Sequence, residues 1–236
     1  MKIALIGNGK MGKTIASLLA ENGHEIHSIF NRDNVLTSEK LKGADVAIEF
    51  TIPSECLKHI SICFNAQVPV IVGTTGWYDQ YHNVISKMTE SNAILCATNF
   101  SIGVQALFHL NKELSRILNR FGGYKACLTE IHHTAKLDKP SGTALTLAQG
   151  IIEESNAYSN WHLKENDGGE KSLPIEALRE ANVPGTHEVI FKSDIDTITL
   201  KHEAHNRLGF ALGAIRAAEF IQNKKGVFTM SDVLNS

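Results

Sequence analysis

The sequence predicts an α/β protein in which an N-terminal doubly wound parallel sheet is joined to an inserted α+β domain. Over the first hundred residues, short apolar runs alternate with helical patterns, which is typical of parallel sheets with helices on both faces. A glycine-rich turn, GNGKMG, stands between the first run and the first helical pattern. After residue 99 the pattern changes to a long amphipathic stretch and paired strand-like runs, which indicates a second domain of different architecture.

The composition is that of an ordinary globular protein. Of the 236 residues, 43% are hydrophobic and 20% are charged, and the net charge at pH 7 is -2. This balance predicts no binding to nucleic acid or to an acidic membrane, and no apolar run reaches the roughly 18 residues that span a bilayer. With no visible leader sequence, we expect a cytoplasmic protein with reduced thiols at Cys56, Cys63, Cys96 and Cys127.

Five apolar runs of strand length account for the first domain. Each is rich in β-branched residues and short enough for a buried parallel strand. Between the first two, Ile15, Leu18 and Leu19 share one helical face, and the helical pattern ends at Gly23, a residue suited to a left-handed cap. The runs are KIALIG (2–7), EIHSIF (25–30), DVAIEFT (45–51), PVIVGTT (69–75) and AILCATN (93–99).

The change of pattern after residue 99 sets the predicted domain boundaries. We expect the inserted domain to span residues 101–208, and the first domain to comprise residues 1–100 together with 209–236. The pattern over residues 209–226 predicts a helix that packs on the first domain.

Inside the inserted domain the pattern predicts two helices and three strands. An amphipathic helix ends at a glycine pair, a strand follows it, and a second helix begins at Ser141. A polar, glycine-bearing stretch is predicted as a mobile loop, and two later runs flank a Ser-Asp turn, which indicates antiparallel pairing. In chain order these are residues 104–123, 124–134, 141–155, 158–171 and 187–204.

The turn GNGKMG has the spacing G-x-G-x-x-G, directly after the first strand and at the start of the first helix. Its glycines permit a tight turn and a close approach of the backbone to a pyrophosphate, which the positive end of the helix attracts. This context favours a Rossmann-type dinucleotide site over a glycine turn without a ligand. The candidate cofactor-binding residues here are Gly7, Asn8, Gly9, Lys10, Met11 and Gly12.

The second strand leads into Asn31 and Arg32, about 20 residues after the fingerprint, where Rossmann domains bind the ribose of the cofactor. Asn31 stands where a carboxylate would favour NADH, and the guanidinium of Arg32 suits a 2′-phosphate. The alternative is that Arg32 is a solvated loop residue. We expect NADPH and/or NADH as cofactor, with NADPH used at least as well as NADH.

The segment EIHHTAKLDKPSGTA, residues 130–144, allows three interpretations. It could be a strand end with solvated polar residues, although so many functional side chains rarely converge in so short a stretch. A metal site is disfavoured, because adjacent side chains on a strand point to opposite faces and the segment lacks His-x-x-x-His spacing and a cysteine partner. No metal is therefore predicted. The third interpretation is an anion-binding site that also donates a proton.

Histidine is a suitable general acid because its pKa lies near neutral pH, and Lys136 adds a positive charge. Ser141, Gly142 and Thr143 begin a helix, whose free N–H groups and dipole of about half a charge can hold a carboxylate. Together these features predict a pocket for a small carboxylic acid beside a nicotinamide, and hence a reductase.

Motifs along nearly the whole chain carry a family resemblance. The most specific is HH-x-x-K-x-D-x-PSGTA, and GNGKMG, EFTIP, VGTTGW, ATNFSIGV, VPGTHEVIF and HEAHNRLGFALGAIRAA accompany it. These motifs resemble the 4-hydroxy-tetrahydrodipicolinate reductase (dihydrodipicolinate reductase) family of diaminopimelate and lysine biosynthesis. The chain departs from the family in a glycine loop that is frequently one residue longer and in a short stretch between Arg32 and Ala44. Asn31 also replaces a frequent acidic residue, which leaves the cofactor preference open.

The resemblance implies roles for particular residues. His132 would donate a proton to the substrate ring, with Lys136 assisting as acid and anion partner. A hydride would pass from NAD(P)H to C4 of an unsaturated cyclic imine, with loss of water from its hydroxylated precursor. The family is usually a homotetramer built through the second domain. The dicarboxylate would be held by His133, Ser141, Gly142 and Thr143, and the nicotinamide side would be lined by Gly73, Thr74, Thr75, Ala97, Thr98, Asn99 and Phe100.

Two other functions share part of this pattern. A non-catalytic module that senses NAD(P) would keep the glycine loop but has no use for the double histidine beside PSGT. A different amino-acid-pathway dehydrogenase, of the homoserine or aspartate-semialdehyde type, would share the first domain. The latter type needs a nucleophilic cysteine in a polar setting, which none of the four cysteines has.

Overall fold

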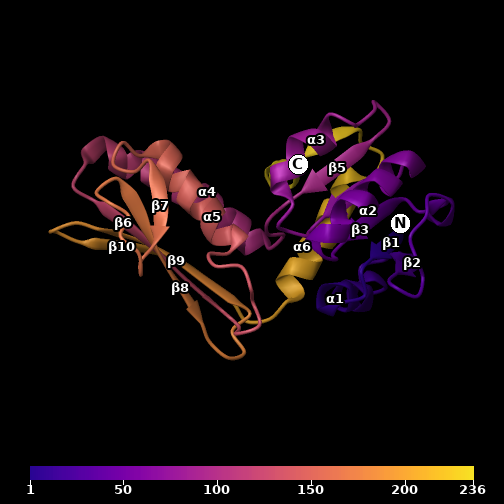
Figure 1. Cartoon of the computed structure of the whole chain (residues 1–236), viewed down its shortest axis with the longest axis horizontal. Helices are drawn as coiled ribbons and strands as arrows, with labels where there is room; N and C mark the ends of the chain where they lie inside the picture. Colours follow the sequence, from indigo (N-terminus) through magenta and orange to yellow (C-terminus); the bar gives the residue numbers. More distant parts are fainter. The chain divides into compact units, whose positions relative to one another are not determined.

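The computed structural model describes residues 1–236 and consists of two compact units (Figure 1). Unit 1 comprises residues 1–102 and 207–236, and unit 2 comprises residues 103–206. The first segment of unit 1 thus ends two residues later than the prediction, and the second segment begins two residues earlier. No helix of the chain is both long and apolar enough to cross a membrane.

Unit 1 is built on a six-stranded sheet in the order β11-β5-β4-β3-β1-β2, with every neighbouring pair parallel. The five predicted strands are present, and the sixth, β11, pairs with β5. The strand order reverses between β1 and β3, which is where ligands bind in sheets of this kind. The strands are β1 (Lys2–Ile6), β2 (Glu25–Phe30), β3 (Val46–Glu49), β4 (Val70–Val72), β5 (Ala93–Cys96) and β11 (Gly226–Phe228).

Alternate residues of these strands face two separate cores, so both faces of the sheet are covered. Ile3 and Leu5 of β1 belong to the core that α1, α6 and α7 close. Ala4 and Ile6 belong to the core that η1, α2 and α3 close. The predicted packing of the C-terminal helix on the first domain is confirmed by α6. The helices are α1 (Lys10–Leu19), η1 (Glu39–Leu41), α2 (Pro53–Ala66), η2 (Tyr78–Gln80), α3 (Tyr81–Ile85), α6 (Leu208–Ile221) and α7 (Met230–Leu234).

Unit 2 is a five-stranded mixed sheet in the order β10-β9-β6-β8-β7 with two helices. The predicted antiparallel pairing of the two late strands is confirmed by β9 and β10. Strand β6 pairs antiparallel with β9 and parallel with β8, and β7 pairs parallel with β8. The elements are α4 (Ile102–Phe121), β6 (Lys125–His132), α5 (Gly142–Glu154), β7 (Asn160–Leu163), β8 (Ser172–Arg179), β9 (Gly185–Lys192) and β10 (Thr197–Ala204).

Two parts of unit 2 differ from the prediction. The stretch 158–171, predicted as a mobile loop, contains β7, a four-residue edge strand without a clear alternation of polar and apolar residues. Strand β8 was missed altogether. It contains Pro174, which lacks a backbone donor and normally argues against a strand inside a sheet. Both parallel pairs of this sheet involve β8, so the sequence pattern did not reveal the parallel part of the sheet.

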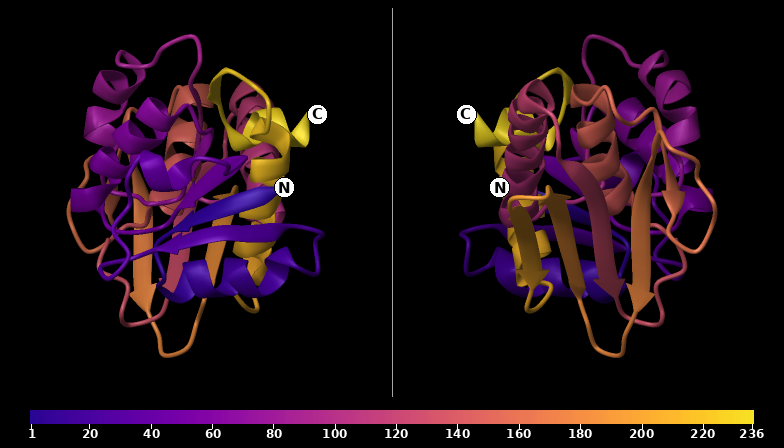
Figure 2. Two further views of the ribbon diagram at one scale, coloured as in Figure 1. Left: turned by 90° about the vertical axis from the view of Figure 1, so that its right-hand side faces the viewer. Right: turned by 90° about the vertical axis from the view of Figure 1, so that its left-hand side faces the viewer.

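Helices α4 and α5 pack on one face of the unit 2 sheet, and the other face is bare (Figure 2, right). Strand β6 shows this division in its alternation, since Leu128, Glu130 and His132 are buried whereas Thr129 and Ile131 are only half-buried. The face that packs on the helices therefore carries both apolar core residues and, at its end, polar residues.

The glycine at 213 is required by the close packing of α6 on the loop after β5. A Cβ atom at Gly213 would overlap the carbonyl oxygen of Phe100, whereas at Gly209 the nearest atom would be Ser101 Oγ at 3.7 Å. We expect Gly213→Ala to lower the free energy of unfolding by about 1–3 kcal/mol, because backbone must shift. Gly209→Ala should leave it unchanged or raise it by up to about 1 kcal/mol. Urea unfolding of both variants is the measurement, and equal stabilities would contradict this view of the packing.

Candidate active site

The glycine turn of unit 1 is tight at two positions and open at a third. Gly7 has a φ of 110°, and a Cβ there would overlap the carbonyl oxygen of Phe50. A Cβ at Gly12 would overlap the carbonyl oxygen of Gly7, whereas one at Gly9 would meet nothing within 4 Å. No side chain caps α1, and its first turn holds no acidic residue, so the N–H groups there suit an anion. The turn, which Asn8, Lys10 and Met11 complete, fits the pyrophosphate of a nicotinamide dinucleotide.

The other predicted cofactor residues gather at the carboxyl edge of the same sheet. Gly73 follows β4 and donates its N–H to the carbonyl of Glu49 at 2.9 Å. Thr74 Oγ1 accepts the N–H of Thr51 at 2.7 Å. The N–H of Ala97, which follows β5, donates to the carbonyl of Val72 at 3.3 Å. The segments 73–75 and 97–100 therefore lie at the ends of neighbouring strands, as the prediction requires.

Asn31 is engaged in a local turn after β2. Its side-chain oxygen accepts the backbone N–H groups of Asp33 and Asn34, both at 2.8 Å. The side-chain carbonyl is therefore occupied, and the amide nitrogen is the part of Asn31 that can reach a ribose hydroxyl. Arg32 and Lys10 are exposed.

A buried carboxylate that the sequence prediction missed lies at the end of β3. Glu49 is fully buried and accepts a short hydrogen bond from the hydroxyl of Thr51. Its other neighbours are His59 Nδ1 at 3.3 Å and Cys56 Sγ at 3.6 Å. Burial and, after it, the charge of Glu49 raise the pKa of the Cys56 thiol and bring that of Cys96 to about 12.

The remaining thiols, Cys63 and Cys127, also have a pKa that burial raises. All four cysteines are free. Since the thiolate is the nucleophile, none of these groups is suited to covalent catalysis of the aspartate-semialdehyde type.

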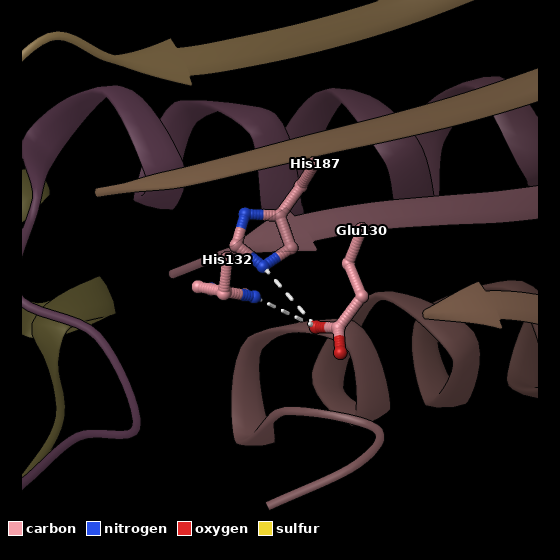
Figure 3. A group of neighbouring side chains, drawn as sticks. All are labelled: Glu130, His132 and His187. Atoms are coloured by element: carbon pink, nitrogen blue, oxygen red, sulfur yellow. Dashed lines mark ion pairs between the residues drawn. The ribbon is translucent and has the colours of Figure 1, made fainter. Parts of the chain in front are cut away.

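In unit 2, cross-strand pairing brings four functional side chains to one end of the sheet. Glu130 and His132 are two residues apart on β6 and therefore point to the same face. In the register of the sheet, Glu130 lies opposite His187 of β9, and His132 lies opposite Arg179 of β8. Figure 3 shows the two imidazoles converging on one oxygen of the Glu130 carboxylate.

Glu130 is fully buried, and nitrogen atoms of four residues surround its carboxylate. The backbone N–H of Ser141 donates to its two oxygens at 3.0 and 3.2 Å. The guanidinium of Arg179 lies 3.4 Å from Oε1, His132 Nδ1 lies 3.5 Å from Oε2, and His187 Nε2 lies 3.8 Å from Oε2. A buried carboxylate needs such partners, because an isolated charge in the interior is strongly unfavourable.

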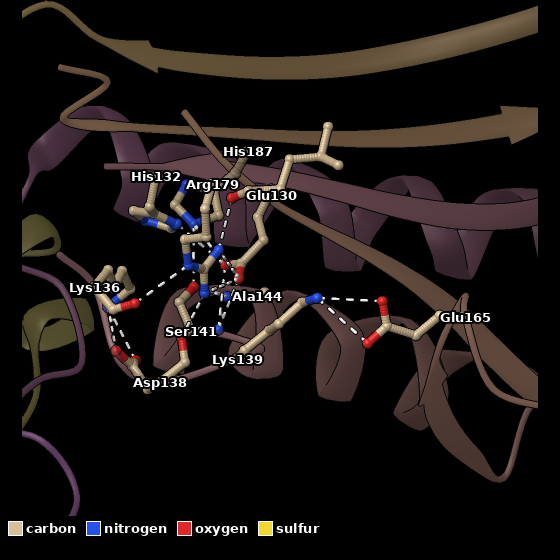
Figure 4. Close-up of polar contacts among 11 residues, drawn as sticks. Glu130, His132, Lys136, Asp138, Lys139, Ser141, Ala144, Glu165, Arg179 and His187 are labelled. Atoms are coloured by element: carbon tan, nitrogen blue, oxygen red, sulfur yellow. Dashed lines mark hydrogen bonds and ion pairs between the residues drawn. The ribbon is translucent and has the colours of Figure 1, made fainter. Parts of the chain in front are cut away.

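Arg179 also fixes the loop that carries Lys136. Its guanidinium donates to the backbone carbonyls of Lys136 at 3.4 Å and Asp138 at 2.5 Å (Figure 4). The ammonium of Lys136 pairs with the Asp138 carboxylate at 2.8 Å. Burial alone would raise the pKa of Asp138, but the hydrogen bond and charge of Lys136 outweigh it and hold that pKa below its usual range.

Helix α5 begins next to this cluster, as predicted, and Ser141 caps it. The Ser141 hydroxyl accepts the N–H of Ala144 at 3.2 Å, lies 3.4 Å from His187 Nε2 and is 2% exposed. Ser141 thus serves the helix cap first, and its contact with a substrate stays a prediction. Gly142 is the first helical residue, Thr143 is buried, and His133 is half-buried.

The surroundings of His132 differ from what the sequence suggests. Burial, and then the positive charges of Lys136 and Arg179, lower its pKa to about 4. The pKa of His187 is lowered to about 3, by burial first and then by His132 and His202. Both imidazoles are therefore neutral at pH 7 in the ligand-free chain.

Glu130, His132 and His187 carry atoms of the types that bind metal ions, all within 4.8 Å of one another. The positive charges of Arg179 and Lys136 beside them oppose the binding of another cation. The absence of a metal site stays a prediction.

The sequence prediction missed Arg179 and His187 and assigned no role to Glu130. Their partners are set by the register of β8 and β9 against β6, and a single sequence does not contain that register. The one available signal was the two-residue spacing of Glu130 and His132, which places both on one face of a strand.

A parallel sheet with a glycine turn, followed by a second unit with a buried acid–base cluster, defines a two-domain nucleotide-dependent oxidoreductase. The family description "Dihydrodipicolinate reductase, N-terminus" matches residues 1–100, and "Dihydrodipicolinate reductase, C-terminus" matches residues 103–234. The chain belongs to the dihydrodipicolinate reductase family, so the resemblance seen in the sequence is confirmed, and the chain is an oxidoreductase with a nicotinamide cofactor.

Relatives at the sequence level cover the whole chain. The chain is 45% identical to the 4-hydroxy-tetrahydrodipicolinate reductase of Christiangramia forsetii, over 100% of its own length and 98% of the relative. It is 36% identical to the enzyme of the same name from Rickettsia bellii, over 98% of its own length and 94% of the relative.

Solved structures confirm the fold. A dihydrodipicolinate reductase from Paenisporosarcina sp. TG-14, described with dipicolinate bound, has a TM-score of 0.77 at 22% identity and covers 97% of both chains. GenD2 from gentamicin A biosynthesis, described in complex with NAD, has a TM-score of 0.62 at 12% identity, with 99% of this chain and 90% of GenD2 covered.

The neutral state of His187 predicts that acid destabilises the protein. In the folded chain His187 stays neutral down to about pH 3, whereas an unfolded histidine takes up a proton near its usual pKa of 6.5. The unfolded state therefore binds more protons below pH 6.5, and the free energy of unfolding should fall there, by at most about 1.4 kcal/mol per pH unit for this histidine. His187→Gln should make the fall less steep in urea unfolding at pH 7.5, 6 and 5. The exposed His82→Gln is the control, and identical slopes in all three proteins would contradict the prediction.

Proposed function

We propose that the chain reduces 4-hydroxy-tetrahydrodipicolinate to tetrahydrodipicolinate with NAD(P)H, with loss of water, in diaminopimelate and lysine biosynthesis. One observation carries the proposal. In a chain that matches this reductase family throughout, His132 and Lys136 stand with a buried carboxylate beside the N-terminus of α5.

The dicarboxylate is proposed to bind to the positive groups at the end of β6. Lys136 has three N–H donors and can hold a substrate carboxylate while it keeps its contact with Asp138. The N-terminal end of α5 carries no acidic residue in its first turn. Glu130 accepts the Ser141 N–H there, and the neighbouring residues Gly142 and Thr143 are proposed to hold a second carboxylate. His133 is proposed as a further partner. Dipicolinate, the ligand of the Paenisporosarcina relative, is a dicarboxylate of this kind.

Unit 1 is proposed to hold the cofactor through its glycine turn and the segments that follow β4 and β5. When bound, the reduced nicotinamide supplies the hydride that is added to the substrate ring. His132 gives the matching proton. Its pKa of about 4 in the free chain is lowered by burial and neighbouring cations, and a bound dianion opposes those cations and raises it. Substrate binding thus prepares the acid that the reaction uses.

We also propose that the chain is a cytoplasmic homotetramer assembled through unit 2. The bare face of its sheet presents apolar side chains from three adjacent strands, namely Ile131, Leu178 and Ile190. The same face carries Glu176 and Glu188, and a face of mixed apolar and polar residues is suited to pairing with a second copy.

The function is tested by NAD(P)H oxidation with the product of the preceding synthase supplied in situ. The wild type should consume the reduced cofactor only when that product is present. His132→Gln should lower kcat by about 10²–10⁴ while the KM for the cofactor barely changes, and His82→Gln should behave as the wild type. No cofactor oxidation by the wild type would overturn the proposed function, and an unchanged kcat in His132→Gln would remove this residue from the mechanism.

The cofactor preference depends on Asn31. We predict that NADPH is used at least as well as NADH, because Asn31 carries no charge that repels a 2′-phosphate and Lys10 and Arg32 are exposed close by in sequence. Asn31→Asp keeps an oxygen for the bonds to Asp33 and Asn34 and adds a negative charge. It should shift kcat/KM toward NADH about tenfold, if the repulsion is near 1.4 kcal/mol.

The control for this prediction is Asn31→Ser, whose hydroxyl can support the turn without a charge. The NADPH preference should also shrink as salt rises, because exposed charges are screened. Measurement of kcat/KM for both cofactors at two salt concentrations decides the matter. A strong NADH preference of the wild type would show that Arg32 does not reach the phosphate.

A further inference from the structure

Glu130 is held in place by several polar groups of unit 2. Its carboxylate accepts the backbone N–H of Ser141 at 3.0 Å and faces the guanidinium of Arg179 at 3.4 Å. Both donors are fixed in turn, Ser141 as the cap of α5 and Arg179 by the carbonyls of the loop after β6. A carboxylate held in this way keeps one orientation, so a side chain that binds to it is oriented as well.

His132 is the side chain that the Glu130 carboxylate can orient. Its Nδ1 atom is buried and has no hydrogen-bond partner at ordinary distance, and a buried polar atom without a partner is unfavourable. Glu130 Oε2 lies 3.5 Å away. Contacts of this length in a ligand-free site commonly shorten when substrate binds.

The orientation has a chemical consequence. A neutral imidazole carries its proton on one nitrogen only, and a carboxylate beside Nδ1 favours the proton on that atom. Nε2 is then the atom that is protonated when the ring becomes a cation and that loses its proton to the substrate. In the opposite tautomer the proton sits on Nε2, and the ring takes up its next proton at Nδ1, next to Glu130.

We propose that Glu130 is the positioning residue of His132: it holds Nδ1–H and leaves Nε2 to deliver the proton, while Arg179 holds Glu130. This inference rests on the proposed function, because it assigns the partner of the acid in that reaction.

The charged groups around His132 determine how its pKa should change when the Glu130 carboxylate is removed. Burial, Lys136, Arg179 and His133 lower the pKa of His132, whereas Asp138 raises it. His187 faces the same ring, with ring centres 5.0 Å apart. The Glu130 carboxylate adds a second negative charge that stabilises the imidazolium, so its loss should lower the pKa of His132 further.

The first experiment compares Glu130→Gln with Glu153→Gln, a matched change at an exposed residue of α5. In Glu130→Gln, kcat should fall about 10–100-fold with little change in KM. Because His132 must be protonated to donate, activity is lost as pH rises through its pKa in the complex. The descending limb of kcat against pH should therefore move to lower pH. Glu153→Gln should leave the rate and the profile unchanged.

The second experiment does not depend on activity. Long-range ¹H–¹⁵N correlation of the His132 ring at neutral pH should show the Nδ1–H tautomer in the wild type and a shift toward Nε2–H in Glu130→Gln, since the carboxamide can donate to Nδ1. An Nε2–H tautomer in the wild type would overturn the inference, whatever happens in the assay. If the wild type showed Nδ1–H but no reductase activity, the proposed function would fail while the assignment of Glu130 as the partner of Nδ1 held.

Arg179→Gln should move the descending limb of kcat in the opposite direction. This variant also tests the proposal if Glu130→Gln does not fold. Removing the guanidinium removes a charge that lowers the pKa of His132, so the descending limb should move to higher pH. A loss of kcat without movement of the limb in either variant would show a merely structural role and overturn the proposal.

Discussion

The buried carboxylate of Glu130 is the constraint on which the arrangement of unit 2 depends. It lies on the central strand β6, accepts the backbone N–H at the start of α5 and faces the guanidinium that ends β8. Leaving such a charge without one of its partners costs about 3–5 kcal/mol. The contacts of Glu130 therefore fix the positions of the sheet, of α5 and of the loop after β6 relative to one another. The same charge sits 3.5 Å from His132. In the role proposed for Glu130, the same group thus serves both the stability of unit 2 and its chemistry.

Unit 1 depends on a different constraint, the absence of side chains at points of close backbone approach. Gly7, Gly12 and Gly73 each stand where a Cβ would overlap a neighbour, whereas Gly9 faces open space. Backbone segments therefore pack closely at the ends of the strands, and space remains at Gly9, where a pyrophosphate is expected to bind. In the proposed function, this backbone geometry binds the cofactor, and the charged cluster of unit 2 recognises the substrate.

The sequence was most informative where structure follows from local pattern. Strands buried on both faces appear as continuous apolar runs, so the sequence predicts β1 to β5. It also predicts the start of α5, which Ser141 caps. Strand β8 contains Pro174 and was missed, and with it Arg179. The lowered pKa of His132 arises from burial and from cations that only the fold assembles. The turn at Asn31 was predictable, since asparagine side chains commonly accept the backbone N–H two residues later.

The division of unit 1 into two separated segments has a consequence for biosynthesis. Residues 103–206 form unit 2 without interruption, whereas α6 and β11, which complete the core and the sheet of unit 1, follow them in the chain. During translation unit 2 can therefore finish folding while unit 1 still lacks α6. Until Gly226–Phe228 leaves the ribosome, β5 is an open strand edge, and open edges pair readily with other chains. This interval is the point in the life of the protein at which we expect chaperones to matter most.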